Sequence, residues 1–312
     1  MLDIFESILP IFLLIGSGAV MRRLPIISDA AWPGMEQLSY WFLYPCLLFA
    51  TIYKADFSSI ELDAMLASLI VAMLAMAGLV LALWPPLKRS GLVAASEYSS
   101  VFQTSVRWNA FIALPLATKI FPPEGAAVVA LAMAAIIVPI NVVVIFVVTR
   151  FANGRSGILD TLKRVALNPL VLAVLLGMAF RQMPFGLYQP LDDTLSLLGS
   201  AALGLGLMAI GAGLRLSDLV TTRLAVWLPV VLKLVLFPVL LVGIAFAFGI
   251  RGDALTYLAL CGAVPTAMNG YVLARQLGGD AELYAAVATL QTALSFFTVP
   301  LALSLAAQFS SG

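Results

Sequence analysis

The chain has 312 residues, of which 62% are hydrophobic and only 11% are charged, and its mean hydropathy is +1.06. A soluble domain has roughly 45–50% apolar and about 25% charged residues, so the composition excludes an ordinary water-soluble protein. The net charge of +1 argues against a nucleic-acid partner. The chain has no histidine, which removes the commonest metal ligand and the usual proton relay. We therefore expect a membrane protein that is not an enzyme and holds neither metal nor cofactor.

The apolar residues form long segments along the whole chain. At the start, Asp3 and Glu6 stand where a signal peptide would carry positive charge, so we expect the first segment to be a retained span. A helical span needs about 20 mostly apolar residues, more than a barrel strand. We predict an all-α membrane protein with ten transmembrane helices and no separate soluble domain. The predicted spans are residues 4–21, 35–53, 62–84, 96–118, 125–149, 166–180, 191–214, 225–249, 254–274 and 283–308.

Basic residues alternate between the connections of these spans. Odd-numbered connections hold 11 lysines and arginines, and even-numbered ones hold four. Basic residues collect on the cytoplasmic side of a membrane. We therefore expect the odd connections, including the 150–164 loop, in the cytoplasm, and both termini in the periplasm.

Ten spans divide into two halves of five, residues 1–152 and 153–312, and an odd number of spans per half inverts the second copy. A sequence echo supports the repeat. Pro10, Gly18 and Arg22 recur at the same offsets as Pro169, Gly177 and Arg181. The fifth and tenth spans also share a late Val-Pro step. We predict two inverted five-helix repeats.

The fourth and ninth spans, which are partners under this repeat, are both interrupted. The first interruption runs from Asn109 to Pro115, and the second covers residues 264–270 and includes Pro265, Thr266, Asn269 and Gly270. Pro and Gly break helices, and Asn can cap a half-helix. Broken helices in lipid are tolerated only where protein or a wet cavity surrounds them, and paired breaks indicate a transporter's binding site. The alternative is a simple proline kink in each span.

Two cations lie deep inside predicted spans, Arg107 beside Asn109 and Lys233 in the middle of the eighth span. A central Lys or Arg costs about 2.5–3.5 kcal/mol to insert and suggests a functional site. Together with the N-termini of half-helices, these charges favour an anion such as a carboxylate. Alternatively, either residue ties unwound carbonyls together or extends to the interface.

Several other polar side chains on the same helices are weaker candidates for the site. Many such groups only bond their own backbone. They are Gln103, Thr104, Thr266, Gln291, Thr292 and Tyr271.

The two interrupted spans resemble those of the auxin efflux carrier family, which includes plant PIN-type carriers and bacterial malate and malonate permeases. The likeness lies in the run from Arg107 to Leu116, and most specifically in the run from Val264 to Glu282. The stretch from Pro10 to Gly18 and the pair Tyr44-Pro45 also fit. The resemblance covers essentially the whole chain.

The resemblance implies a fold like that of sodium/proton antiporters. Spans 1, 2, 6 and 7 would form a scaffold domain that often dimerises, and the others a transport domain in which helices 4 and 9 cross. Asn109 aligns with the crossover asparagine of the family and would contact substrate. The long cytoplasmic loop of plant members is absent, and Gly270 replaces their second crossover proline. An aromatic auxin is therefore not the expected substrate.

We predict a bacterial inner-membrane permease that moves small organic anions by elevator-type alternating access. The site would be built by Gln103, Arg107, Asn109, Pro115, Lys233, Pro265, Thr266, Asn269, Gly270 and Pro45. One alternative is a sodium- or proton-coupled carrier of bile-acid-like or auxin-like amphipathic substrates. Another is a transporter-like sensor that binds its ligand without moving it.

Overall fold

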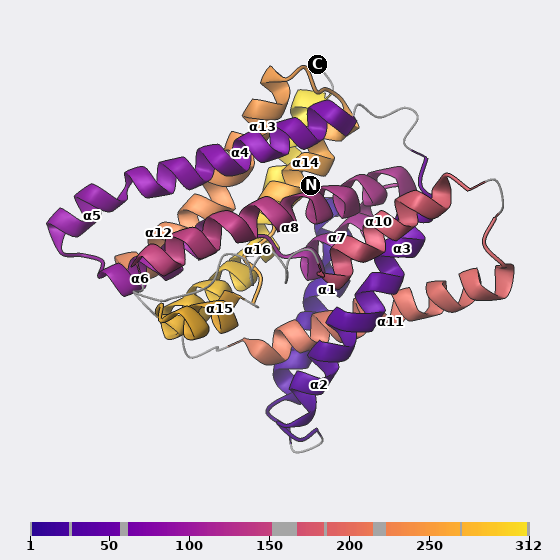
Figure 1. Ribbon diagram of the computed structural model, residues 1–312, viewed down its shortest axis with the longest axis horizontal. Coiled ribbons are helices and arrows are strands. Elements are labelled where there is room, and N and C mark those ends of the chain that lie inside the picture. Colours follow the sequence, from indigo (N-terminus) through magenta and orange to yellow (C-terminus); the bar gives the residue numbers. More distant parts are fainter. Residues whose placement is uncertain are drawn as a thin grey trace.

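The structure, a computed structural model, describes residues 2–24, 27–56, 62–151, 167–183, 186–214, 223–268 and 270–310. Every regular element in these ranges is a helix, which confirms the all-α prediction (Figure 1). Five helical stretches in the described ranges are long and apolar enough to cross a membrane: Leu62–Ser90, Pro123–Val148, Gln189–Gly213, Leu224–Ala247 and Ala281–Phe309. The total of ten spans and their inverted arrangement stay predictions.

The helices of the first half follow the predicted segments. They are α1 (Leu2–Met21), α2 (Ala31–Leu38), η1 (Ser39–Leu43), α3 (Tyr44–Lys54), α4 (Leu62–Ala82), α5 (Trp84–Ser90), α6 (Ala95–Val106), α7 (Ala110–Ile120) and α8 (Pro123–Phe151). The π-helical turn η1 joins α2 to α3, so that these three elements form one continuous helix. The fourth predicted span is divided into α6 and α7 by residues 107–109, which are not helical.

The second half shows a similar succession of helices. They are α10 (Pro169–Arg181), α11 (Gln189–Gly213), α12 (Leu224–Val231), η3 (Leu232–Leu236), α13 (Phe237–Ala247), α14 (Asp253–Ala263), α15 (Gly270–Leu277) and α16 (Ala281–Ser310). Here too a π-helical turn, η3, joins two α-helical stretches. The ninth predicted span ends its first half, α14, at Ala263, and residues 264–268 are not helical.

Each π-helical turn is closely followed by a proline. Pro45 lies two residues after η1, and Pro238 lies two residues after η3. A proline inside a helix has no amide hydrogen and clashes with the carbonyl four residues earlier. The wider π turn relieves that clash without ending the helix, and single π turns are frequent at functional sites.

The helices pack as two groups. In the first helix group, α1 packs against α11, and α3 packs against both α10 and α11, with α2 and η1 also on α11. The second helix group comprises α4 to α8 and α12 to α16, in which α14 packs against α13 and α16, and α6 against α8 and α12. Figure 1 shows α2, α3, α10 and α11 towards the right and α5, α6, α12 and α15 towards the left. The groups meet chiefly where α8 contacts α3 and α10, and where α1 contacts α7 and α16.

Two glycines allow α1 and α11 to approach closely. A Cβ added to Gly18 would lie 2.0 Å from the Met208 carbonyl oxygen, and one added to Gly211 would lie 1.7 Å from that of Ile15. Small residues let helix backbones touch where lipid supplies no hydrophobic force between helices. This contact fixes α11 as one wall of the cavity described below.

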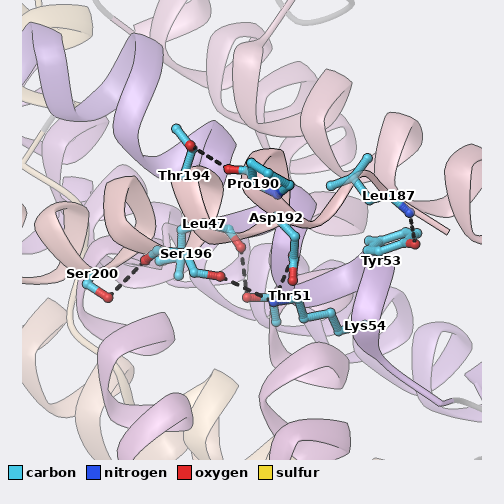
Figure 2. A network of polar contacts seen from close by, with 10 residues as sticks. All are labelled: Leu47, Thr51, Tyr53, Lys54, Leu187, Pro190, Asp192, Thr194, Ser196 and Ser200. Atoms are coloured by element: carbon cyan, nitrogen blue, oxygen red, sulfur yellow. Dashed lines mark hydrogen bonds and ion pairs between the residues drawn. The ribbon is translucent and has the colours of Figure 1, made fainter.

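Polar contacts tie α3 to α11 at the opposite end of the first helix group (Figure 2). The Lys54 ammonium lies 2.8 Å from an Asp192 carboxylate oxygen and donates to the Ser196 hydroxyl at 3.2 Å. The Tyr53 hydroxyl accepts from the Leu187 amide at 2.7 Å. These contacts make the first helix group a coherent unit.

Candidate functional site

The first break, residues 107–109, is stabilised by Asn109, whose side chain is buried. Its Oδ1 accepts from the Ile112 amide at 3.3 Å and thus caps α7, as expected from the sequence. A helix N-terminus has four amides without intrahelical partners, and an Asn cap satisfies one of them. The Asn109 Nδ2 donates to the Thr266 carbonyl at 3.3 Å. The two breaks are therefore in direct contact.

The second break, residues 264–268, is held by side chains of α16. The Thr266 amide donates to Gln291 Oε1 at 2.9 Å. The Tyr284 hydroxyl donates to the Ala267 carbonyl and lies 3.0 Å from the Thr266 hydroxyl. These bonds replace the backbone bonds lost at Pro265, which is buried. A helix can be unwound inside a membrane because its polar groups find such partners.

Gln291 connects both broken helices through one fully buried carboxamide. While its Oε1 accepts from the Thr266 amide, its Nε2 donates to the Thr104 and Pro229 carbonyls, each at 3.0 Å. Thr104 lies in the last turn of α6, where carbonyls have no intrahelical partner. From the sequence alone, Gln291 is only one of the weaker polar candidates. A carboxamide inside a long apolar helix was the available signal.

Lys233 is fully buried in η3 and serves the second broken helix. Its ammonium donates to the Gly262 carbonyl, at the end of α14, at 3.0 Å. It also lies 4.4 Å from the centre of the Phe237 ring and 5.4 Å from that of Trp108. Aromatic faces stabilise a cation. Lys233 lines neither of the two cavities described next. Its placement fits the alternative in which it holds unwound backbone carbonyls together.

A large cavity separates the two breaks from the first helix group. Its volume is about 1280 Å³. On one side it is lined by Arg107, Asn109, Ala267 and Met268 from the breaks, and on the other by residues of α1, α2, η1 and α11. Exposed residues such as Arg22 and Arg23 mark its mouth beside the C-terminus of α1. A smaller cavity of about 60 Å³ adjoins it.

Arg107 borders both cavities although its residue is only 7% exposed. Its Nη2 donates to Asn141 Oδ1 of α8 at 3.1 Å. The cation therefore faces the cavity beside Asn109 and the N-terminus of α7. An anion in the cavity would meet positive charge and helix amides together.

Other predicted site residues lie away from the cavity surface. Gln103 is fully buried, and neither polar atom of its amide has a hydrogen-bond partner in the described part of the chain. Gly270 begins α15 against Tyr284, whose hydroxyl would lie 2.1 Å from an added Cβ. Pro45 is half-buried at the start of α3. Asn269 falls outside the described residues.

The sequence predicted that the first interruption extends to Pro115. In the structure Pro115 does not interrupt its helix and lies buried inside α7. A proline at this position cannot donate to the Phe111 carbonyl four residues earlier. The Tyr44 hydroxyl of α3 donates to that carbonyl instead, at 3.1 Å. This donor from another helix explains how α7 continues through the proline.

No group of three or more potential metal-ligating side chains occurs in the part of the chain that the structure describes. The polar groups at the breaks are amides, hydroxyls and cations, which bind anions by hydrogen bonding and charge.

The chain is similar to known membrane transport proteins. Residues 155–303 match the model of a family described as membrane transport protein. An "Uncharacterized transporter" of Methanothermobacter thermautotrophicus is 23% identical over 302 residues, 95% of this chain and 96% of the relative. A "Putative malonate transporter" of Rhizobium meliloti is 32% identical over 139 residues, 44% of this chain and 43% of the relative.

These matches confirm the resemblance to the auxin efflux carrier family that the interrupted spans suggested. They identify the chain as a membrane transporter and not an enzyme.

Proposed function

We propose that the chain is a secondary transporter of small organic anions, most simply carboxylates. The observation that carries this proposal is the cavity of about 1280 Å³ that reaches the contact between the two breaks. At its inner end the N-terminus of α7 and the Arg107 guanidinium border one space. The relative named as a malonate transporter makes malonate the first anion to test.

Alternating access of the elevator type is the mechanism that we propose. The first helix group corresponds to the scaffold domain implied by the resemblance, and the second to the transport domain. The packing supports this division because, among the described residues, the side-chain hydrogen bonds to residues 107–109 and 264–268 come from the second helix group. The breaks would correspond to the crossing point of helices 4 and 9. Dimerisation through the scaffold domain, and coupling to a proton or sodium ion, belong to the same proposal.

The test is uptake of labelled malonate by purified protein in proteoliposomes, with and without a sodium or proton gradient. Asn109→Ala removes the cap of α7 and the bond to Thr266, and Asn109→Asp keeps the cap while adding negative charge. We expect both variants to lose uptake. Asn109→Ala should also lose stability, by about 1 kcal/mol, the usual worth of a cap. Asn109→Asp should lose stability as well, because a carboxylate cannot donate to the Thr266 carbonyl.

The exposed Gln182→Ala change, outside the cavity, provides a control with a similar loss of an amide. Its uptake should match that of the wild type. Undiminished uptake by Asn109→Asp would contradict the assignment of the anion site to this end of the cavity. If the wild type moved no organic anion, the proposed function would be wrong.

A further inference from the structure

The Arg107 side chain has fewer partners than a buried guanidinium requires. Its residue is 7% exposed, and its one hydrogen bond in the described structure is to the neutral side chain of Asn141. Its Nε has no partner, and no carboxylate lies within ion-pair distance in the described ranges. A guanidinium carries five N–H donors, and burying it without a counter-ion is costly. Arg107 is therefore equipped to receive an anion that arrives from the cavity.

A second unpartnered polar group faces the same cavity from the other helix group. Ser39 lies at the start of η1, is fully buried, and its hydroxyl has no hydrogen-bond partner among the described residues. It nevertheless lines the large cavity. A buried hydroxyl without a hydrogen-bond partner is unfavourable, so its position in the cavity wall is suited to a ligand.

Tyr40, the next residue of η1, borders both cavities together with Arg107 and Asn141. Its hydroxyl accepts from Asn168 Nδ2 at 3.0 Å, which leaves its own hydrogen available to donate. The π turn before Pro45 thus presents two hydroxyl donors, and the break presents a guanidinium. These groups come from opposite walls of one cavity.

We propose that Arg107, Ser39 and Tyr40 form a second anion-binding subsite beside Asn109, which binds a second negatively charged group of the transported molecule. This inference rests on the proposed function, since the first negative group would lie at Asn109 and the N-terminus of α7. Arg107 is then a specificity-determining residue that selects dianions over monoanions. Asn141 is a positioning residue, because its carboxamide orients the guanidinium without neutralising it.

The neutral character of Asn141 provides the sharpest test. Asn141→Asp keeps the shape of the side chain but places a carboxylate beside Arg107. This carboxylate would pair with the guanidinium in place of the second negative group of the ligand. Arg107→Gln removes the charge outright. Tyr40→Phe and Ser39→Ala remove one donor each without changing charge. Arg251→Gln, an exposed arginine outside the cavity, serves as the matched control.

The measurement is the affinity of purified protein for malonate and succinate and for their monomethyl esters, at a pH where each free carboxyl is ionised. Wild-type protein should bind each dianion at least about tenfold more tightly than its ester, because a hydrogen bond to a charged group is worth about 1.5–3 kcal/mol. Arg107→Gln and Asn141→Asp should abolish this preference, because they weaken the binding of the dianion much more than that of the ester. Arg251→Gln should keep the wild-type ratio.

Smaller losses, about threefold to tenfold for dianions alone, are expected for Tyr40→Phe and Ser39→Ala. These variants and Asn141→Asp decide the question if Arg107→Gln does not fold. Equal wild-type affinity for dianions and esters would overturn the subsite but leave the proposed function intact. The subsite would also be overturned, with the proposed function intact, if Asn141→Asp kept the wild-type ratio of dianion to ester affinity. Failure of the wild type to bind any of the probes would overturn both.

Discussion

Single side chains from neighbouring helices complete the backbone hydrogen bonding at the two breaks. Lys233 donates to a carbonyl at the end of α14, and Tyr284 donates to the Ala267 carbonyl. Gln291 forms hydrogen bonds with three backbone groups at once. Unpaired amides and carbonyls cost several kcal/mol in a medium without water. At the residue scale, the site therefore depends on side chains that never touch the cavity.

Gln291 is the residue on which this support can be measured. Gln291→Leu removes the partner of the Thr266 amide and of the Thr104 and Pro229 carbonyls. Each buried group left unpaired costs about 1–3 kcal/mol, so we expect a loss of at least about 2 kcal/mol in the free energy of unfolding. Chemical unfolding of purified protein in detergent measures it.

Gln291→Glu keeps the acceptor for Thr266, and burial favours the protonated carboxyl, which can donate only one of the two bonds to carbonyls, so its loss should be intermediate. The exposed Gln182→Leu substitution should change stability by no more than about 0.5 kcal/mol. Wild-type stability for Gln291→Leu would show that the two breaks do not depend on this carboxamide.

At the scale of whole elements, the sequence predicted where helices are interrupted but not how the interruptions are repaired. The Asn109 side chain caps an amide three residues later and Pro265 lacks an amide hydrogen, so the breaks beside them follow from local chemistry. Pro115 has the same local signal, yet α7 continues through it because Tyr44 of α3 supplies the missing donor. The depth of Lys233 was likewise predictable, whereas its acceptor, the Gly262 carbonyl, depends on how η3 packs against α14. Tertiary partners of this kind leave no periodic signal in the chain.

Tyr44 and Pro115 should therefore show strong coupling in a double-mutant cycle. In the wild-type background, Tyr44→Phe leaves the Phe111 carbonyl unpaired and should cost about 1–3 kcal/mol of unfolding free energy. In a Pro115→Ala background, residue 115 regains an amide that bonds the same carbonyl, so Tyr44→Phe should cost little. Thermal and chemical unfolding of the four proteins gives the coupling energy. Additive effects of the two changes would contradict this account of α7.

On the scale of the whole molecule, the cavity lies between two helix groups that each hold together by their own contacts. The first is tightened by Gly18 and Gly211 between α1 and α11, and the second by the bonds around the breaks. The cavity mouth lies near Arg22 and Arg23, in a connection that the charge bias predicts to be cytoplasmic. On that prediction, the arrangement would be the inward-open state of the proposed transporter.

Cysteine labelling tests this orientation directly. Both native cysteines, Cys46 and Cys261, would first be replaced by alanine. Three single cysteines are then introduced: Ala209→Cys in the cavity wall, Ser90→Cys at the end of α5, and Gln189→Cys at the start of α11. The charge bias places Ser90 on the cytoplasmic side and Gln189 on the periplasmic side.

An impermeant maleimide added to right-side-out membrane vesicles should therefore label Gln189→Cys alone. In inside-out vesicles it should label Ser90→Cys and Ala209→Cys, and saturating malonate should slow the reaction at Ala209→Cys only, because bound anion fills the cavity beside it. If Ala209→Cys reacted only from the side of Gln189→Cys, the cavity would open outward and the state assigned to this structure would be reversed. If Ser90→Cys and Gln189→Cys exchanged sides, the charge rule itself would fail for this chain, and the proposed periplasmic position of both termini would fail with it.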